Sequence, residues 1–395
     1  MIEILIREDV QQFIFNNENV DPFELSLKHK TLFGLPTQII ADQIAARKKA
    51  KTKLPEWYAT KGIVYPPLIS MEQCSSEITA KHKTKILSGE SLIDLTGGAG
   101  IDTFYLSKVF EHVIYVERNA TLCEIAKHNF QILGATNIEV VHGDSEKFIN
   151  TYDKKVSAIF IDPARRSESN QKVFLWSDCE PDIQTLQGRL LLISKNVLIK
   201  ASPILDVSAG ASDLNDLKSV HIVSLKNECK ELLYLLGQAE VSKEITTVNY
   251  KSNETAEYFS FNRDEETETK VTYEKPKAFL YEPNSSIMKS GAFKVLGAKL
   301  DLKKLHPNTH LYTSENLVEG FPGRVFSIEA VVKYDKKEIF KHLPQKKANI
   351  AVRNFPDDVA TIRKKTRIQP GGEVYIFATT LYDNQKAMII CHKEK

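Results

Sequence analysis

The chain has 395 residues, of which 42% are apolar and 26% charged, so disordered and collagen-like polymers are excluded. A chain of this length predicts two or three packed domains. Residues 276–395 contain 21 Lys and Arg against 12 Asp and Glu, a net charge of +9 that leaves −7 for the first 275 residues. This asymmetry indicates either a basic C-terminal module for an anionic partner or a lysine-rich solvated surface.

Two further features of the composition bear on location and metal use. No run of about 18 apolar residues occurs, and the opening segment MIEILIREDVQQF mixes acidic and basic side chains, unlike a signal peptide. The five cysteines form no CxxC pair, which argues against a zinc site and against a disulfide framework. We therefore expect a cytoplasmic protein with no membrane partner and no metal, and a monomer is the favoured state.

Residues 1–84 are the first predicted domain, a helical region. They are rich in helix formers, and within residues 37–54 the side chains of Ile39, Ile40 and Ile44 fall on one face at helical spacing. Two roles are open for these helices, which are binding a substrate and covering a neighbouring sheet.

Residues 85–250 alternate short β-branched runs with helix-like stretches. The runs are residues 91–95, 112–117, 137–142, 156–162, 196–201 and 219–225. Strands that alternate with helices predict a parallel sheet with right-handed crossovers. We therefore predict an α/β fold with a Rossmann-like parallel sheet and an antiparallel edge strand.

The last third of the sequence has a different pattern. Residues 251–276 form a hairpin-like tract with an acidic middle, which predicts an edge feature of the sheet or a linker. From residue 277 a new alternation of strands and helices continues to residue 395 and ends in paired strands around residues 374–381 and 386–393. This pattern predicts a third domain, of α+β type.

The clearest motif is the run from Asp94 through Thr96, Gly97, Gly98 and Gly100, which closes the first strand and opens the next helix. Glycines at such a bend let the backbone approach a ligand and leave the N-terminus of the helix facing it. The run therefore predicts a loop that holds a nucleotide or a nucleotide-containing cofactor.

The residues after this run separate the folds that use such loops. A phosphate-binding P-loop has Lys and then Ser or Thr after its last glycine, whereas Ile101 and Asp102 follow Gly100 here. A nicotinamide-type GxGxxG motif has a glycine where Thr103 stands, which disfavours that interpretation and leaves it open.

Polar residues also end the next three strands. Glu117 ends the second strand and is placed to accept hydrogen bonds from ribose hydroxyls, and Asp144 with Ser145 follows the third strand. Asp162 and Pro163 follow the fourth, where the proline fixes φ and stiffens the loop. Because ligands of open α/β sheets bind at the carboxyl ends of the strands, these residues predict a single cofactor site.

These motifs resemble those of the class I S-adenosylmethionine-dependent methyltransferases over roughly residues 85–240, and the whole chain is similar to bacterial methyltransferases with a C-terminal THUMP-like domain. The resemblance implies a ferredoxin-like or THUMP-like C-terminal module, S-adenosyl-L-methionine as cofactor, and RNA, which THUMP domains elsewhere help to bind, as partner. The implied cofactor-binding residues are Asp94, Thr96, Gly97, Gly98, Gly100, Glu117, Asp144, Ser145 and Ser76. The implied catalytic residues, beside the transferred methyl group, are Asp162, Pro163 and Arg165.

The loop at Asp162 bears on the acceptor atom. Amino-group methyltransferases usually have Asp or Asn, two prolines and an aromatic that stacks on the base, whereas Ala164 and Arg165 take the last two places here. A guanidinium can stack on a base or bind a phosphate, so Arg165 and Arg166 are candidate replacements, with a structural ion pair as the alternative for Arg166.

The same loop also resembles that of the RNA C5-uridine methyltransferases, which need a cysteine after the fifth strand. Ala201 stands at that position, which argues against covalent catalysis. Cys229 is the other candidate for a nucleophilic cysteine, and the alternative is that it is a buried structural residue. The order of motifs is similar to that of the cap guanine-N2 methyltransferases, so an exocyclic purine nitrogen is the predicted acceptor.

The basic module supplies candidate contacts to phosphates. They are Lys346, Lys347, Arg353, Arg363, Lys364, Lys365 and Arg367. Tyr375 and Phe377 share one strand face, which favours core packing, and residues 279–286 predict a turn or helix cap. Two other functions stay open: a methyltransferase acting on a protein or a small molecule, and a cofactor- or RNA-binding protein without catalysis.

Overall fold

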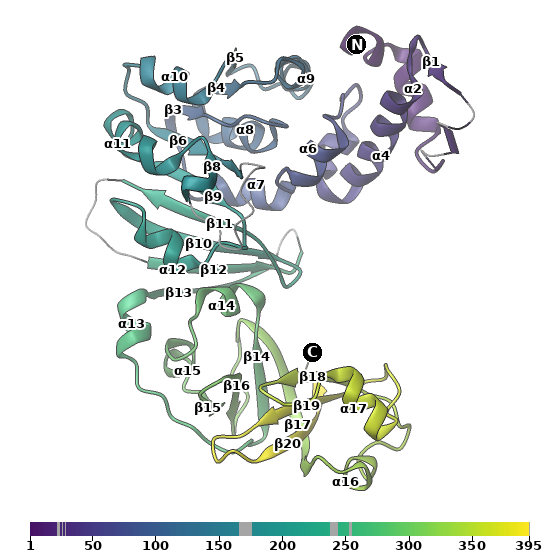
Figure 1. Cartoon of the computed structure of the whole chain (residues 1–395), viewed down its shortest axis with the longest axis vertical. Helices are drawn as coiled ribbons and strands as arrows, with labels where there is room; N and C mark the ends of the chain where they lie inside the picture. Colours follow the sequence, from purple (N-terminus) through teal and green to yellow (C-terminus); the bar gives the residue numbers. More distant parts are fainter. Residues whose placement is uncertain are drawn as a thin grey trace. The chain divides into compact units, whose positions relative to one another are not determined.

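The computed structural model describes most of the chain (Figure 1). The described residues are 1–21, 24–25, 27, 29–165, 176–237, 244–252 and 255–394. The chain divides into an N-terminal unit, Met1–Lys218 with Glu231–Val241, and a C-terminal unit, Ser219–Lys230 with Ser242–Lys395. None of the described helices is both long and apolar enough to span a membrane.

The N-terminal region is helical, as predicted. Its helices are α1 (Ile2–Leu5), α2 (Glu8–Asn16), α4 (Thr37–Lys53), α5 (Pro55–Ala59), α6 (Leu68–Gln73) and α7 (Glu77–Lys83), with a short pair of strands, β1 (Thr31–Leu32) and β2 (Leu35–Pro36). On α4, Ile40 and Ile44 are fully buried and Ile39 is partly buried against the same cluster.

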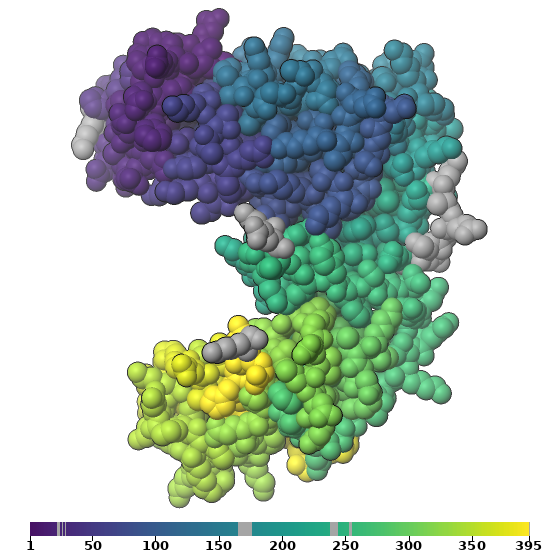
Figure 2. All heavy atoms as spheres, turned by 180° about the vertical axis from the view of Figure 1, so that it is seen from behind, coloured from purple at the N-terminus to yellow at the C-terminus, as the bar shows by residue number. Residues whose placement is uncertain are grey.

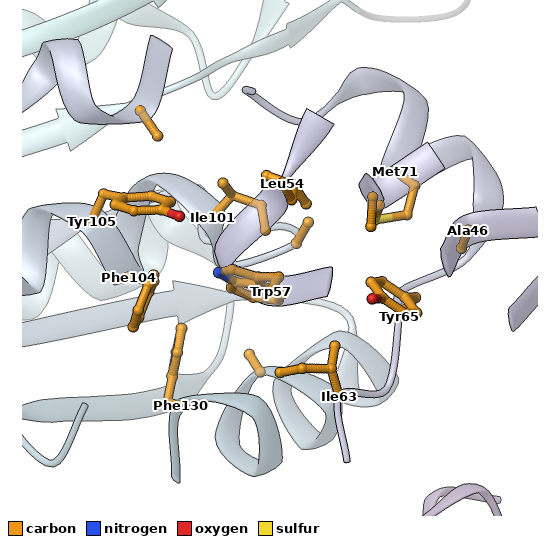
Figure 3. Packing of buried hydrophobic residues seen from close by; sticks show 14 of the residues in the cluster. Ala46, Leu54, Trp57, Ile63, Tyr65, Met71, Ile101, Phe104, Tyr105 and Phe130 are labelled. Carbon is orange, nitrogen blue, oxygen red and sulfur yellow. The ribbon is translucent and has the colours of Figure 1, made fainter. Parts of the chain in front are cut away.

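These helices pack onto the α/β part of the same unit. Trp57 of α5 meets the ring of Phe104 edge to face, with ring centres 5.9 Å apart, and Met71 of α6 belongs to the same buried cluster (Figure 3). Figure 2 shows the purple helices and the blue segments that follow them as one continuous surface. The N-terminal helices thus share a buried cluster with Tyr115 of the sheet, as the covering role requires, and the substrate-binding role stays open.

In the described part of the chain, nine strands form a mixed sheet in the order β13-β12-β10-β11-β9-β6-β3-β4-β5. They are β3 (Gly89–Asp94), β4 (Phe110–Glu117), β5 (Ile138–His142), β6 (Ala158–Ile161), β9 (Val197–Ala201), β10 (Leu217–Leu225), β11 (Glu228–Leu236), β12 (Glu244–Tyr250) and β13 (Ala256–Asn262). The five strands β9, β6, β3, β4 and β5 pair in parallel, and β11 pairs antiparallel with β9. The predicted Rossmann-like sheet is thus confirmed.

Helices follow the strands of this sheet, as the alternating pattern predicts. They are α8 (Ile101–Leu106), α9 (Ala120–Ile132), α10 (Ser145–Thr151), α11 (Ile183–Ile193) and α12 (Val207–Ser212). The central strands β6 and β9 are almost fully buried, with all four residues of β6 buried, whereas the outer strand β5 has no fully buried residue. This explains why short β-branched runs were a good guide to them.

The hairpin predicted in residues 251–276 begins earlier than its range. β12 starts at Glu244 and pairs antiparallel with β13, which is the edge of the sheet, and α13 (Arg263–Glu268) carries the acidic residues. Residues 256–262 therefore belong to this sheet. The residues after α13 connect it to the second sheet, which begins at β14.

The C-terminal unit contains a second sheet of seven strands among its described residues, in the order β15-β16-β14-β17-β20-β19-β18. They are β14 (Phe279–Pro283), β15 (Lys303–His306), β16 (Thr309–Ser314), β17 (Gly323–Lys333), β18 (Asn349–Arg353), β19 (Val374–Thr380) and β20 (Lys386–Lys393). Its helices are α14 (Ser285–Ser290), α15 (Val295–Lys299), α16 (Lys336–Phe340) and α17 (Val359–Thr366).

Two predictions for this unit are confirmed and a third is confirmed in part. β19 and β20 form the predicted strand pair, which is antiparallel, and Phe377 is fully buried in a cluster against which Tyr375 packs. Of residues 279–286, predicted to form a turn or helix cap, Phe279–Pro283 form the strand β14, and Asn284 caps α14 by accepting a hydrogen bond from the backbone N–H of Ile287 at 3.1 Å.

Candidate functional site

The first strand end is organised around a buried carboxylate. Asp94 closes β3, is 1% exposed, and accepts hydrogen bonds from the backbone N–H of Thr96 at 3.0 Å and from the hydroxyl of Thr103 at 2.6 Å. Burial raises the pKa of Asp94 to about 7, against these two hydrogen bonds, which lower it. Thr103 stands where a nicotinamide motif has a glycine. Its hydroxyl binds Asp94, and Asp94 in turn binds the backbone of the loop at Thr96.

The three glycines of the loop meet different needs. A Cβ atom on Gly97 would lie 2.2 Å from the ring of Tyr115, and one on Gly100 would lie 2.9 Å from the ring of Phe130. Both glycines are therefore required by packing. Gly98 has φ +54°, and a Cβ atom there would meet nothing closer than 3.6 Å, so this glycine alone lets the loop present its backbone to an open space.

The second strand end is tied to this loop. Glu117 closes β4 and accepts a hydrogen bond from the backbone N–H of Gly98 at 2.9 Å and another from that of Asn119 at 2.8 Å. Each carboxylate oxygen has two acceptor positions, so both can still accept from a ligand hydroxyl. The predicted ribose acid and the predicted glycine loop are thus in direct contact.

The third strand end and the leading segment are helix starts. Asp144 caps α10 by accepting from the N–H of Lys147 at 2.9 Å, while the Ser145 hydroxyl donates to the carbonyl of Leu95 at 2.5 Å. Ser76 caps α7 by accepting from the N–H of Thr79 at 3.2 Å. Ser145 is therefore bonded to the backbone directly before the glycine loop, whereas Asp144 and Ser76 each cap a helix, and cofactor binding by these three residues stays a prediction.

The fourth strand end is held at two points. The backbone N–H of Asp162 donates to the hydroxyl of Thr96 at 2.6 Å, and Oδ2 of Asp162 accepts from Nζ of Lys200 at 2.5 Å. Pro163 is buried behind it, and β7 (Ala164–Arg165) pairs with β8 (Cys179–Glu180). Arg166 and the side chain of Arg165 lie outside the described residues, so the stacking role predicted for them has no structural account.

A buried network of charges beside this edge was missed by sequence reasoning. Lys83 of α7, fully buried, places Nζ 2.8 Å from both carboxylate oxygens of Glu231 and 3.0 Å from Oδ1 of Asp102. Nζ of Lys200 lies 3.8 Å from Oδ2 of Asp102, which also accepts from the hydroxyl of Ser75 at 2.8 Å. The network thus links the N-terminal helices, the glycine-loop helix and two central strands.

The charges shift one another's pKa in the expected directions. Burial opposes ionisation of Asp102, but Lys83 and Lys200 outweigh it and hold the pKa of Asp102 below its usual range. Burial also opposes the charge of Lys200, but Asp162, Asp102 and Glu231 raise its pKa above the usual range. The available signal was Lys200 inside the apolar run 197–201 and Glu231 directly before the apolar run 232–236, because ionisable groups are rarely buried unless they are paired.

The basic residues of the C-terminal module divide into two groups. Arg363 donates to the carbonyls of Ile368 at 3.0 Å and Ala348 at 3.1 Å, and Lys365 pairs with Asp357 at 2.6 Å. Arg353 pairs with the buried carboxylate of Glu282. These three cations have structural partners, in contrast to the predicted phosphate-binding role, whereas Lys346, Lys347, Lys364 and Arg367 have no ion-pair partner among the described residues.

Comparison with known families agrees with this architecture. Residues 89–239 match the RNA cap guanine-N2 methyltransferase family, residues 279–322 a ferredoxin-like domain, and residues 323–393 a THUMP domain-like family. A search of curated proteins gives no match. These matches identify a methyltransferase domain that is followed by ferredoxin-like and THUMP-like domains.

One solved structure shows the family to which this chain belongs. A crystal structure from Porphyromonas gingivalis W83, named "putative methyltransferase", is 31% identical, covers 100% of this chain and 98% of its own, and has a TM-score of 0.88. The chain belongs to the family of this protein. One partial match is the "putative O-methyltransferase" from Klebsiella pneumoniae, with 11% identity over 41% of this chain and 80% of that chain and a TM-score of 0.32. Another is the "putative RNA methyltransferase" from Pyrococcus horikoshii, with 12% identity over 49% of this chain and 99% of that chain and a TM-score of 0.32.

Proposed function

We propose that this protein is an S-adenosylmethionine-dependent RNA methyltransferase that acts on an exocyclic nitrogen of a purine. The observation that carries the proposal is the joint position of the glycine loop, Glu117 and Asp162, which Thr96 and Gly98 connect by hydrogen bonds. A match to RNA cap guanine-N2 methyltransferases over the sheet, and to THUMP-like domains beyond it, supports the choice of an RNA nitrogen.

The residues present fit the cofactor. The open space at Gly98 allows a ligand to approach the backbone, and Glu117 keeps acceptor positions for ribose hydroxyls beside it. The residues proposed to form the cofactor site are Asp94, Thr96, Gly97, Gly98, Gly100, Glu117, Asp144, Ser145 and Ser76. Of these, Asp94, Gly97 and Gly100 act by shaping the loop, since their side chains or missing Cβ atoms face the protein interior.

Asp162 is the proposed contact to the acceptor. When bound, S-adenosylmethionine supplies an electrophilic methyl group on a sulfonium. Transfer to the acceptor nitrogen would exchange an S–C bond, whose electrons would stay on sulfur, for an N–C bond, and the nitrogen would have to lose a proton. Oδ1 of Asp162 accepts no hydrogen bond from the described residues, so it can orient the acceptor N–H and receive that proton.

The test is transfer of labelled methyl from S-adenosylmethionine to total RNA from a strain that lacks the protein, followed by mass spectrometry of the nucleosides. We expect label in one purine nucleoside methylated on its exocyclic nitrogen. Parallel incubations with the protein and small-molecule fractions of the same strain provide the comparison. Label in a pyrimidine C5 position would contradict the acceptor, and label only in another fraction would contradict the substrate.

A further inference from the structure

Lys200 lies at the carboxyl end of β9, between the fourth strand end and the buried network. Its side chain is 11% exposed, and its shortest contact is the 2.5 Å bond from Nζ to Oδ2 of Asp162. This is a charge-assisted hydrogen bond, which is shorter and stronger than a bond between neutral groups.

The network around Lys200 leaves Asp162 as its main partner. Lys83 already binds Glu231 through two contacts of 2.8 Å and Asp102 through one of 3.0 Å. Asp102 is further from Lys200, at 3.8 Å. Lys83 is therefore the nearer cation for Glu231 and Asp102, and Asp162 is the carboxylate that Lys200 contacts at hydrogen-bond distance.

Without Lys200, Asp162 would lose its fixed orientation. The side chain of Asp162 is 37% exposed, so water would compete for both of its oxygens. The backbone bond to Thr96 fixes the main chain of Asp162 only. Lys200 is thus the described group that fixes which carboxylate oxygen is occupied and which remains available.

We propose that Lys200 is a positioning residue for methyl transfer, which occupies Oδ2 of Asp162 and so presents Oδ1 alone to the acceptor N–H. This role rests on the proposed function. It assigns Lys200 no contact with cofactor or acceptor, and the bonds that form and break are those given above. A displacement of about 1 Å in a catalytic group can cost about 100-fold in rate, so this is the expected scale of the effect.

The network also extends the role of the N-terminal helices. Ser75, just before α7, donates to Asp102, and Lys83 in α7 donates to Ser75 at 3.1 Å and to the carbonyl of Thr79 at 3.3 Å. Helix α7 therefore holds Asp102 and Glu231 in place behind Lys200. The positioning of Asp162 depends in this way on residues outside the Rossmann-like sheet.

The test is a double-mutant cycle on kcat with saturating S-adenosylmethionine and the same total RNA. We expect Lys200→Met to lower kcat about 100-fold in the wild-type background and less than threefold in an Asp162→Asn background, since Lys200 acts through Asp162. Cofactor affinity by calorimetry should change less than fivefold. Lys108→Met, which removes the exposed ion pair with Glu56, is the matched control and should leave kcat unchanged.

An equal loss in both backgrounds would overturn the proposal, because a purely structural lysine would act independently of Asp162. If Lys200→Met does not fold, Lys200→Arg takes its place in the cycle, and its loss must again disappear in the Asp162→Asn background. A wild-type protein that labels RNA but gives an additive cycle refutes the role of Lys200 alone. A wild-type protein that labels no fraction refutes the proposed function together with this role.

Discussion

Charged side chains serve different ends in the two units. At the strand ends of the N-terminal unit, Lys83 is fully buried between two carboxylates. In the THUMP-like part, Lys365 pairs with Asp357 while 57% of its side chain remains exposed. Buried pairs are costly to disrupt because the remaining charge is left without a partner, whereas exposed pairs contribute little. The first arrangement fixes groups in place, whereas the second leaves Lys365 paired with Asp357 but largely exposed to solvent.

The largest effect on methyl transfer is expected from substitution of Asp162, the proposed contact to the acceptor. Asp162→Ala should lower methyl transfer by at least about 1,000-fold, because both the oriented acceptor and the proton-accepting oxygen are lost. Affinity for S-adenosylmethionine, measured by calorimetry, should stay within about tenfold. Asp162→Asn keeps one acceptor oxygen and should lose less; full activity of the alanine variant would remove Asp162 from the site.

The contrast in ion pairs can be measured directly by unfolding. Lys83→Met leaves Asp102 and Glu231 buried with less compensation and should destabilise the N-terminal unit by about 3–5 kcal/mol. Lys365→Met should cause no measurable change in the unfolding midpoint of the C-terminal unit. Denaturant titrations followed by circular dichroism provide both values. Equal losses in the two variants would show that burial does not distinguish the pairs.

The carboxyl group of Asp94 makes stability depend on pH. Its pKa is about 7 in the folded protein and about 3.9 when unfolded, so between these values the folded state binds more protons and stability falls as the pH rises. Asp94→Asn removes this titration. Its stability relative to wild type should therefore improve from pH 5 to pH 8, by at most about 2.6 kcal/mol. A difference that stays constant across that range would contradict the raised pKa.

Two neighbouring glycines separate packing from ligand access. Gly97→Ala should destabilise the fold by about 1–3 kcal/mol, because its Cβ atom would overlap the ring of Tyr115. Gly98→Ala should cost only about 1–2 kcal/mol of backbone strain and should lower cofactor affinity at least tenfold. Thermal melts and calorimetry on both variants measure the contrast. Unchanged cofactor affinity in Gly98→Ala would place the ligand elsewhere.

The smallest effects are expected for single lysines on the C-terminal surface. Lys347→Gln and Lys364→Gln should each weaken RNA binding by the full chain a few-fold and reduce the slope of log affinity against log salt by about one. Arg363→Gln should instead lower stability, because Arg363 holds two backbone carbonyls. Binding that is independent of salt in the wild-type protein would exclude phosphate contacts by this surface.

Much of the fold follows from local sequence patterns. Runs such as residues 158–161 predict buried parallel strands because both faces of such strands are apolar, and the helical stretches between them predict crossovers. The contact of the glycine loop with Glu117, and with Asp162 through Thr96, is also foreseeable, since the ends of parallel strands share one edge. The particular roles of these residues in binding and catalysis remain predictions.

Other features depend on contacts between distant residues. Lys83 and Glu231 are 148 residues apart, and nothing near either one identifies its partner. Arg363 belongs to a basic run typical of phosphate binding, yet it caps carbonyls of its own domain. Ser76 caps a helix, while its neighbour Ser75 reaches Asp102.

The sequence by itself determined the Rossmann-like sheet, the helical N-terminus, the glycine loop and the basic C-terminal module, because each follows from local periodicity, turn chemistry or composition. Only the tertiary structure decided that Lys200 binds Asp162 and that α7 supports it through Lys83. A buried charge must find its counter-charge in space, and the spatial neighbour is set by the packing of strands and helices rather than by position along the chain.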